Sequence, residues 1–202
     1  MKTRAYFDKK IEALKNELYE AIHELASVYQ NTHEKYFIYP QEEEEISFYN
    51  SSTDTFENHK IGEVLVDKKG ICIYPKLDDY CPYALSDIIN IHDILSLRSI
   101  FENENLRNKL CREVADLAAT CRGKEVQYLI YPQENEKEIQ FLNSASEKFE
   151  PCKIKNILIG ETWVYVYPVS SAFCSYNLPQ IRNSDDLMIV KSLITREMNR
   201  SI

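Results

Sequence analysis

The chain has 202 residues, 44% of them hydrophobic and 28% charged, which is typical of a globular protein and excludes a disordered or collagen-like chain. Its formal net charge of −8 argues against a nucleic-acid backbone as partner, because phosphate binding needs a surplus of Lys and Arg on one face. Charges interrupt the N-terminal segment, and no window approaches the ~18 apolar residues of a membrane span, so we expect a cytoplasmic protein that contacts no membrane.

The first element that the sequence predicts is an α-helix over residues 11–28. Its apolar side chains recur every three or four positions, which places them in one stripe along the helix. We expect this stripe to pack on a neighbouring sheet, and a short coiled coil is the alternative use for it. The stripe consists of Ile11, Leu14, Leu18, Ile22, Leu25 and Val28.

Four β-strands are expected after this helix, because four short runs are rich in β-branched and aromatic residues and are separated by turn residues. An antiparallel meander is the simplest topology for them. The tripeptide Ile-Tyr-Pro ends the first and fourth runs, and proline suits strand ends because it cannot donate a ladder hydrogen bond. A second helix completes the unit at about residues 86–102. The four runs are Tyr36–Tyr39, Ile46–Asn50, Ile61–Asp67 and Ile71–Tyr74.

The whole pattern then occurs a second time, most visibly where YFIYPQEEEE at residues 36–45 returns as YLIYPQENEK at residues 128–137. The spacing between the copies is 92 residues before the acidic loop and 93 after it, which indicates a tandem duplication. We therefore predict an α+β fold with a duplicated α-β-β-β-β-α unit, antiparallel meander sheets flanked by helices, and pseudo-twofold symmetry. The predicted repeats are residues 1–93, with a net charge of −8, and residues 94–202, which are neutral and expected to pack closely on the first.

Alternation of side chains along the expected strands leaves apolar residues on both faces of each sheet. Leu65 is assigned to the face under the helices, and Val64 and Val66 to the opposite face. In the second copy, Ile157 and Ile159 are likewise assigned to the opposite face. This opposite face is rich in Tyr, and is either covered by the other repeat or open to a partner or an apolar ligand. The candidate binding residues on it are Tyr39, Tyr74, Tyr131, Trp163, Tyr165 and Tyr167.

An acidic run follows the first expected strand and is echoed in the second copy. Four consecutive glutamates do not match a calcium loop, which interleaves Asp, Asn and Gly around the ion. We interpret the run as a solvated hairpin tip, and the alternative is an acidic patch that attracts a cation or a basic partner. It consists of Glu42, Glu43, Glu44 and Glu45.

No pattern in the sequence predicts catalytic residues, a cofactor or a metal. Cys81 and Cys174 occupy equivalent places, but a catalytic thiol needs a neighbouring base. The nearest candidate base, His92, aligns with Asp185, so a Cys/His pair is not duplicated. The six cysteines show no zinc-binding spacing and are expected to be free thiols. Phosphate-binding loops and the common hydrolase and kinase signatures are absent from the sequence as well.

The C-terminal part of each copy is a strand–turn–strand followed by LSDIINIHDILSLRSI in the first and LPQIRNSDDLMIVKSLI in the second. This pattern, which covers about half of each repeat, resembles small uncharacterised proteins of gut Bacteroidetes that often travel on mobile elements. The resemblance carries no catalytic motif and implies an intracellular bacterial protein.

Three functional hypotheses follow from the sequence. The first is a non-enzymatic protein-interaction module that binds another protein or forms a homodimer through the acidic half or a Tyr-lined surface. The second is a small-molecule binding protein or an enzyme with its site between the repeats. The third is an acidic inhibitor or immunity-type protein that covers a basic active site.

Overall fold

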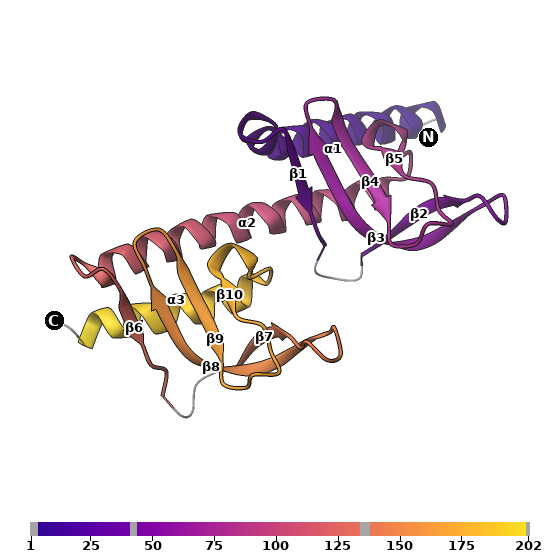
Figure 1. Ribbon diagram of the computed structural model, residues 1–202. Helices are drawn as coiled ribbons and strands as arrows, with labels where there is room; N and C mark the ends of the chain where they lie inside the picture. Colours follow the sequence, from indigo (N-terminus) through magenta and orange to yellow (C-terminus); the bar gives the residue numbers. More distant parts are fainter. Residues whose placement is uncertain (1–3, 41–43, 134–137, 201–202) are drawn as a thin grey trace. The chain divides into compact units, whose positions relative to one another are not determined.

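The computed structural model describes residues 4–40, 44–133 and 138–200, with side chains from residue 9 onward. These residues form an α+β fold with three α-helices and two antiparallel sheets of five strands each (Figure 1). The chain divides into two compact units, Met1–Asn105 and Leu106–Ile202, which we call the N-terminal and the C-terminal unit. The predicted α+β class and the duplicated unit are confirmed.

The elements follow the same order in both units. In chain order, the first are α1 (Arg4–Thr32), β1 (Lys35–Ile38), β2 (Glu45–Asn50), β3 (Thr55–Asp67), β4 (Gly70–Pro75), β5 (Tyr83–Ala84), a 3-10 turn (Leu85–Asp87) and α2 (Ile91–Arg122). They are followed by β6 (Tyr128–Ile130), β7 (Glu138–Leu142), β8 (Phe149–Ile159), β9 (Val164–Pro168), β10 (Tyr176–Asn177), a second 3-10 turn (Leu178–Gln180) and α3 (Ser184–Arg200). The short strands β5 and β10 escape prediction because two residues carry no periodicity.

One continuous helix, α2, belongs to both units. The predicted repeat boundary, between residues 93 and 94, falls within its first turn, whereas the compact units divide between residues 105 and 106. The polar triplet Asn103-Glu104-Asn105 does not interrupt the helix, and two of its side chains have partners in the N-terminal unit. Tyr36 donates its hydroxyl hydrogen to Glu104 over 2.6 Å, and Tyr29 donates to Asn105 over 2.5 Å.

Each sheet is antiparallel, as expected, and pairs consecutive strands from its second strand onward, but its first strand departs from the simple meander. Strands β1 and β2 do not pair with each other, since both pair with β3, β1 with its second half and β2 with its first half. β6 and β7 pair with β8 in the same way. The first half of β3, residues 55–60, is polar and was predicted as a loop, and its pairing with β2 makes it a strand.

A β-bulge corrects the predicted faces of the sheets. The register of β3 against β4 shifts between Ile61 and Glu63, and the extra residue reverses the alternation of side chains beyond it. Val64 and Val66 therefore face the helices and are fully buried, whereas Leu65 lies on the opposite face, half-buried. The assignment of all three residues was wrong.

The same bulge occurs in β8, between Ile154 and Asn156, so Ile157 and Ile159 are also core residues and their predicted position was wrong. In β3 the bulge needs a glycine, because a Cβ atom on Gly62 would lie 2.9 Å from the Pro75 carbonyl oxygen. β8 forms its bulge with Lys155 at the counterpart position.

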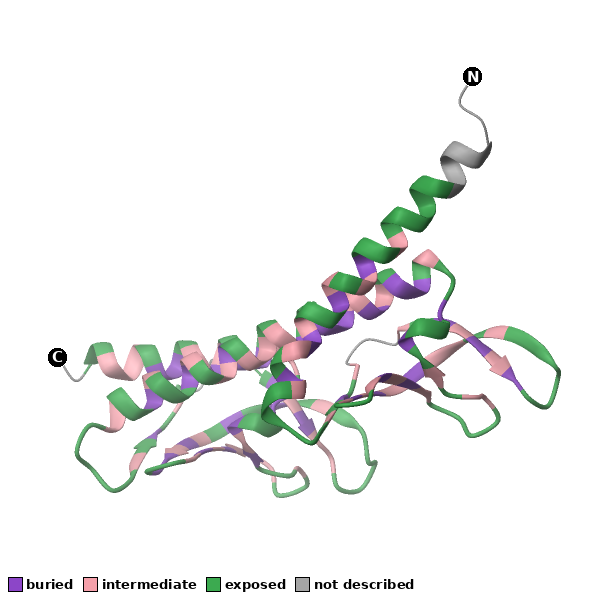
Figure 2. Ribbon diagram, turned by 90° about the horizontal axis from the view of Figure 1, so that it is seen from above, coloured by how far each residue is buried: buried purple, intermediate pink, exposed green. Residues whose placement is uncertain are grey.

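The helices of each unit cover one face of its sheet and leave the other face without a helix (Figure 2). The two cores use counterpart positions of the helices. In the N-terminal unit, the buried helix residues include Leu18, Ile22 and Ala26 of α1 and Ile94, Leu97 and Phe101 of α2. Their counterparts in the C-terminal unit are Leu110, Val114 and Ala118 of α2 and Leu187, Val190 and Ile194 of α3.

Candidate functional site

An aromatic ladder lies on the outer face of the C-terminal sheet, the face away from the helices. It consists of Trp163, Tyr165 and Tyr167, which alternate along β9 and the turn before it and therefore point to the same side. The rings of Trp163 and Tyr165 are 5.3 Å apart at an angle of 62°, and those of Tyr165 and Tyr167 are 6.1 Å apart. All three side chains are half-buried, so part of each aromatic surface is open to contact.

Gly160 holds the first rung of the ladder in place. A Cβ atom on this glycine would lie 2.2 Å from Cε2 of Trp163, so the indole ring lies directly over the backbone of the turn. The Gly160 N–H donates to the Trp163 carbonyl oxygen over 2.8 Å and closes this turn. The position of the indole is therefore fixed by the turn that precedes β9.

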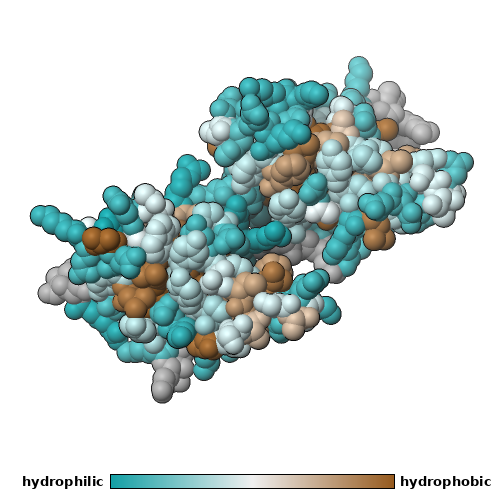
Figure 3. Space-filling view, viewed as in Figure 1, coloured by the Kyte–Doolittle hydropathy of each residue, from teal (hydrophilic) through white to brown (hydrophobic). Residues whose placement is uncertain are grey.

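The ladder continues across the sheet through its strand neighbours. Tyr165 lies opposite Leu158, and Leu158 lies opposite Leu129, which is 39% exposed. Tyr167 lies opposite Asn156, whose buried Oδ1 atom has no hydrogen-bond partner among the residues that the structure describes. Figure 3 looks onto the outer face of the C-terminal sheet and shows apolar and pale side chains gathered over it. This surface combines apolar area with polar groups.

The outer face of the N-terminal sheet differs at the same positions. The counterparts of the ladder are Gly70, Cys72 and Tyr74, so only one of three aromatic side chains is present. The Cys72 thiol raises the pKa of the half-buried Tyr74. Phe37 and Tyr39, which are 40% and 43% exposed, stack with their ring centroids 6.5 Å apart.

The six predicted binding residues thus fall into two groups. Tyr39 and Tyr74 belong to the N-terminal unit. The other four belong to the C-terminal unit, where three form the ladder and Tyr131 follows β6 and is 62% exposed. Sequence alternation identified the ladder residues because the bulge in β8 does not alter the alternation within β9.

The predicted acidic patch is described only in part. Glu42 and Glu43 lie outside the described residues. Glu44 is half-buried, and its carbonyl oxygen accepts the N–H of Ile61 over 3.0 Å. Glu45 is exposed at the start of β2, opposite Lys60. The described half of the run therefore leads into a strand.

A polar network around Glu57 braces the β2–β3 hairpin. The Glu57 carboxylate accepts hydrogen bonds from Thr53, Thr55 and Tyr80 over 2.7–3.0 Å, and these bonds lower its pKa to about 2. The ring of His59 stacks on Tyr80 at 4.3 Å. Such a network resembles a catalytic cluster, but its position in the hairpin indicates a bracing role.

The C-terminal unit repeats this brace in reduced form, which supports the structural interpretation. Glu150, the counterpart of Glu57, accepts from Ser146 over 2.7 Å and from Asn143 over 3.0 Å, and these bonds lower its pKa. Phe173 replaces Tyr80 and has no hydroxyl to donate.

Two buried carboxylates also recur in both units and connect a helix to a strand. Asp93 accepts the backbone N–H of Ser47 over 3.2 Å, and Asp186 accepts that of Gln140 over 3.0 Å. Burial raises the pKa of both carboxyls. Each lies in the first turn of its helix, where the helix dipole favours a negative charge, so both are structural ties.

No metal centre or reactive thiol emerges from the described residues. Within residues 4–40, 44–133 and 138–200, no three His, Cys, Asp or Glu side chains come together as metal ligands would. All six cysteines are free, and burial raises the pKa of Cys121, which disfavours a thiolate. None of the helices in these ranges is both long and apolar enough to cross a membrane.

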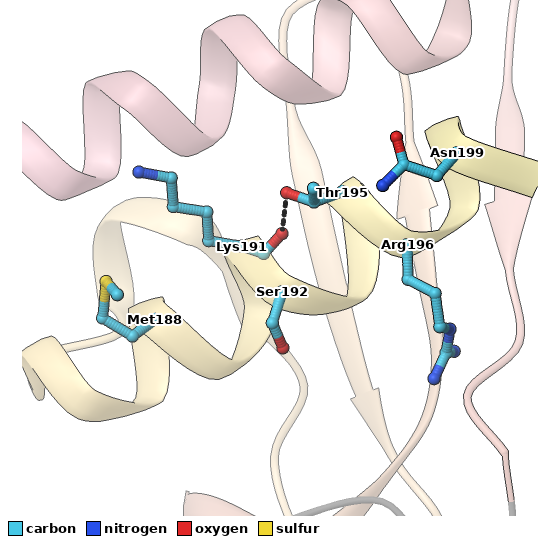
Figure 4. A pocket seen from close by; sticks show the side chains of 6 residues that line it. All are labelled: Met188, Lys191, Ser192, Thr195, Arg196 and Asn199. Atoms are coloured by element: carbon cyan, nitrogen blue, oxygen red, sulfur yellow. Dashed lines mark hydrogen bonds between the residues drawn. The ribbon is translucent and has the colours of Figure 1, made fainter.

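A shallow depression of about 390 Å³ follows one face of α3, and the sequence analysis did not single it out. Figure 4 shows that its side chains do not converge on one point, since Lys191 points towards α2 and Arg196 away from it. Lys191 is also paired with Glu113 at 2.7 Å. The lining residues are Met188, Lys191, Ser192, Thr195, Arg196 and Asn199.

Comparison of the chain with known protein families, with curated proteins and with solved structures gives no match.

Proposed function

We propose that the protein is a non-enzymatic interaction module that binds another protein through the outer face of its C-terminal sheet. The observation that carries this proposal is the aromatic ladder of Trp163, Tyr165 and Tyr167. Tyr and Trp are enriched at protein interfaces because they offer a large contact area at a small cost in side-chain entropy, together with a polar group.

The comparison between the units supports a role beyond folding. Gly70 and Cys72 occupy the first two ladder positions in the N-terminal unit, which forms the same sheet without the two aromatic rings. The fold therefore does not require Trp163 and Tyr165. A half-exposed aromatic pair that the framework does not need is more consistent with a contact surface than with a core.

The shape and chemistry of the surface favour a protein over a small molecule. Small molecules are usually enclosed in a concave pocket, whereas the ladder lies on the face of a sheet. The tyrosine hydroxyls of the ladder give this surface polar groups in addition to its apolar area. We expect an apolar partner surface with a few hydrogen-bond donors.

Charge separates this proposal from the acidic-inhibitor hypothesis. The sequence of the N-terminal unit has 11 Lys and Arg against 20 Asp and Glu, and that of the C-terminal unit has 13 against 12. Binding through the nearly neutral unit should change little with salt. Binding through the acidic unit should weaken as salt screens its charges.

The test is capture of partners from an extract of cells that naturally produce the chain. The full-length protein is compared with a Trp163→Ala/Tyr165→Ala variant and with a Cys72→Ala/Tyr74→Ala variant, which changes counterpart positions of the N-terminal sheet. We expect the wild type and the Cys72→Ala/Tyr74→Ala variant to retain one partner protein at both about 0.1 M and about 0.5 M salt. The Trp163→Ala/Tyr165→Ala variant should lose this partner.

Three results would overturn the proposal. The first is that the wild type captures nothing at either salt concentration. The second is that the ladder variant retains the partner as well as the wild type does. The third is a partner released at high salt from every variant, which would assign binding to the acidic unit. Circular dichroism of both variants establishes that the fold is intact.

A further inference from the structure

Helix α1 carries apolar residues beyond those that its own core needs. Leu18, Ile22 and Ala26 are buried in the N-terminal unit, at 3% exposure or less. One and two turns earlier, Leu14 and Ile11 are 44% and 46% exposed. Figure 2 shows the exposed N-terminal part of α1 extending past the other described elements of this unit.

The exposed residues belong to a heptad pattern that extends over most of the helix. From Ile11 to Val28, the positions of α1 that are separated alternately by three and four residues are all apolar, as in a coiled-coil seam. These positions are Ile11, Leu14, Leu18, Ala21, Leu25 and Val28, and their counterparts in α2 are Asn103, Leu106, Leu110, Glu113, Leu117 and Thr120.

Three of the six counterpart positions in α2 are thus polar, although α2 packs in the C-terminal unit as α1 packs in the N-terminal unit. The core positions, by contrast, are apolar in both units. The fold therefore needs the seam residues that pack in the core, Leu18 and Leu25, and does not need apolar residues at the positions of Ile11, Ala21 and Val28. Of the seam residues, Ile11 and Leu14 lie on turns that extend from the unit, and only Ile11 of the two lacks an apolar counterpart in α2. Two adjacent exposed apolar side chains on these turns indicate contact with a second helix.

We propose that this helix is α1 of a second copy of the chain, and that the two N-terminal segments pair in antiparallel orientation. In the proposed register, Ile11 of one chain packs against the partner subunit's Leu14, and twofold symmetry repeats the contact. Burial of two pairs of exposed aliphatic side chains supplies the apolar part of the interface.

Charges beside the seam select the antiparallel orientation. In an antiparallel pair, equivalent flanking positions face each other, which brings Lys10 close to the partner subunit's Glu17. A parallel pair would instead place Lys10 close to the partner subunit's Lys15. The flanking charges therefore attract in the antiparallel pair and repel in the parallel one.

A longer antiparallel register, with Ile11 against the partner subunit's Val28, is less favourable for two reasons. It would place Glu17 near the partner subunit's Glu24, which are like charges. It would also need Leu18, which is only 3% exposed because it already packs in its own core. The short register uses the turns that project and leaves the core unchanged.

The size of the interface sets the expected affinity. The helix from residue 4 to residue 17 is about 20 Å long, so the pair buries less than the roughly 1,200 Å² of a standard stable interface. We therefore expect a reversible dimer that dissociates at about micromolar concentrations.

Analytical ultracentrifugation of the full-length chain over a wide concentration range tests the proposal. The wild type should form a dimer as concentration rises, and Leu14→Glu should weaken it by at least about tenfold. Two matched controls should associate like the wild type. They are Leu106→Glu, at the counterpart position with 50% exposure, and Val28→Glu, on the same seam with 47% exposure.

A charge exchange tests the register without changing the apolar contact. Lys10→Glu should weaken the dimer by repulsion, and the double variant Lys10→Glu/Glu17→Lys should restore it. Circular dichroism establishes that each variant keeps its helices. Four results would overturn the proposal. The first two are a wild type that stays monomeric and a dimer that survives Leu14→Glu. The other two results are equal losses of association from Val28→Glu and Leu14→Glu, and failure of the double variant to restore association.

Discussion

The N-terminal and C-terminal units place the same residue types under their helices and different ones on their outer faces. Phe48 and Phe141 are counterparts, and both are fully buried. On the outer faces, Gly70 and Cys72 stand where the other unit has Trp163 and Tyr165. The duplication thus allows a comparison within one chain. Residues kept in both copies are those that the fold requires, and residues found in only one copy are free to serve binding.

Hydrogen bonds that connect the Tyr83 and Tyr176 hydroxyls to a neighbouring strand are also kept in both units. The Tyr83 hydroxyl accepts the N–H of Tyr49 over 2.8 Å, and the Tyr176 hydroxyl accepts the N–H of Leu142 over 2.5 Å. Because each tie satisfies a backbone donor at a counterpart position, it belongs to the shared framework.

The largest effect is expected from the shared core. Phe48→Ala and Phe141→Ala should each lower the free energy of unfolding by about 3–5 kcal/mol, because each leaves a cavity in a packed core. Denaturant titration followed by circular dichroism measures both, and the fluorescence of Trp163, the single Trp of the chain, reports on the C-terminal unit. A loss below about 1 kcal/mol in either variant would show that the two cores are not equivalent.

Gly160→Ala should affect only the C-terminal unit. The new Cβ atom collides with the Trp163 ring, so the indole must move, at a cost of about 1–3 kcal/mol. The fluorescence maximum of Trp163 should shift to longer wavelength as the ring becomes more exposed. Glu161→Ala, an exposed change in the same turn, is the control and should leave the spectrum unchanged. An unchanged spectrum for Gly160→Ala would contradict the described packing of the indole.

Removing the tyrosine hydroxyl that accepts a backbone N–H should lower the free energy of unfolding of either unit, by less than the core substitutions do. Tyr176→Phe leaves the Leu142 N–H without its acceptor and should cost about 1–2 kcal/mol. Tyr83→Phe should cost less, since Tyr83 is more exposed than Tyr176 and water replaces the lost acceptor more easily. Tyr131→Phe, at a 62% exposed position, is the control without an expected effect. Equal stabilities of all three variants would rule out the ties.

The smallest effect is a difference in acid sensitivity between the two hairpin braces. The pKa of Glu57 is lowered to about 2, so its stabilising contribution is complete above its ordinary pKa of 4.5 and is lost as the pH falls towards 2. Glu57→Gln should therefore flatten the decrease of the melting temperature in this range. Glu150→Gln should flatten it less, because Glu150 accepts fewer hydrogen bonds. The opposite order would contradict the proposed role of the hydrogen bonds.

The sequence predicted the architecture because its repeat and its periodicities are strong, but it misjudged the faces of β3 and β8. A bulge shifts the alternation by one residue, and only the Gly62 of β3 hints at it, whereas Lys155 gives no indication in β8. The ladder was found because the alternation of side chains is regular from Trp163 through β9. The projection of α1 could not be predicted, since which turns of a helix are covered depends on tertiary packing.

The continuity of α2 has a thermodynamic consequence. When one unit unfolds, the half of α2 that it contributes loses its packing, and the other half gains a new end near Asn105, a residue type that caps helix ends well. Even a missing helix cap typically costs about 1 kcal/mol. The helix joins the two units without a break in its hydrogen-bonded backbone. Unfolding of one unit should nevertheless change the stability of the other only slightly through this helix alone.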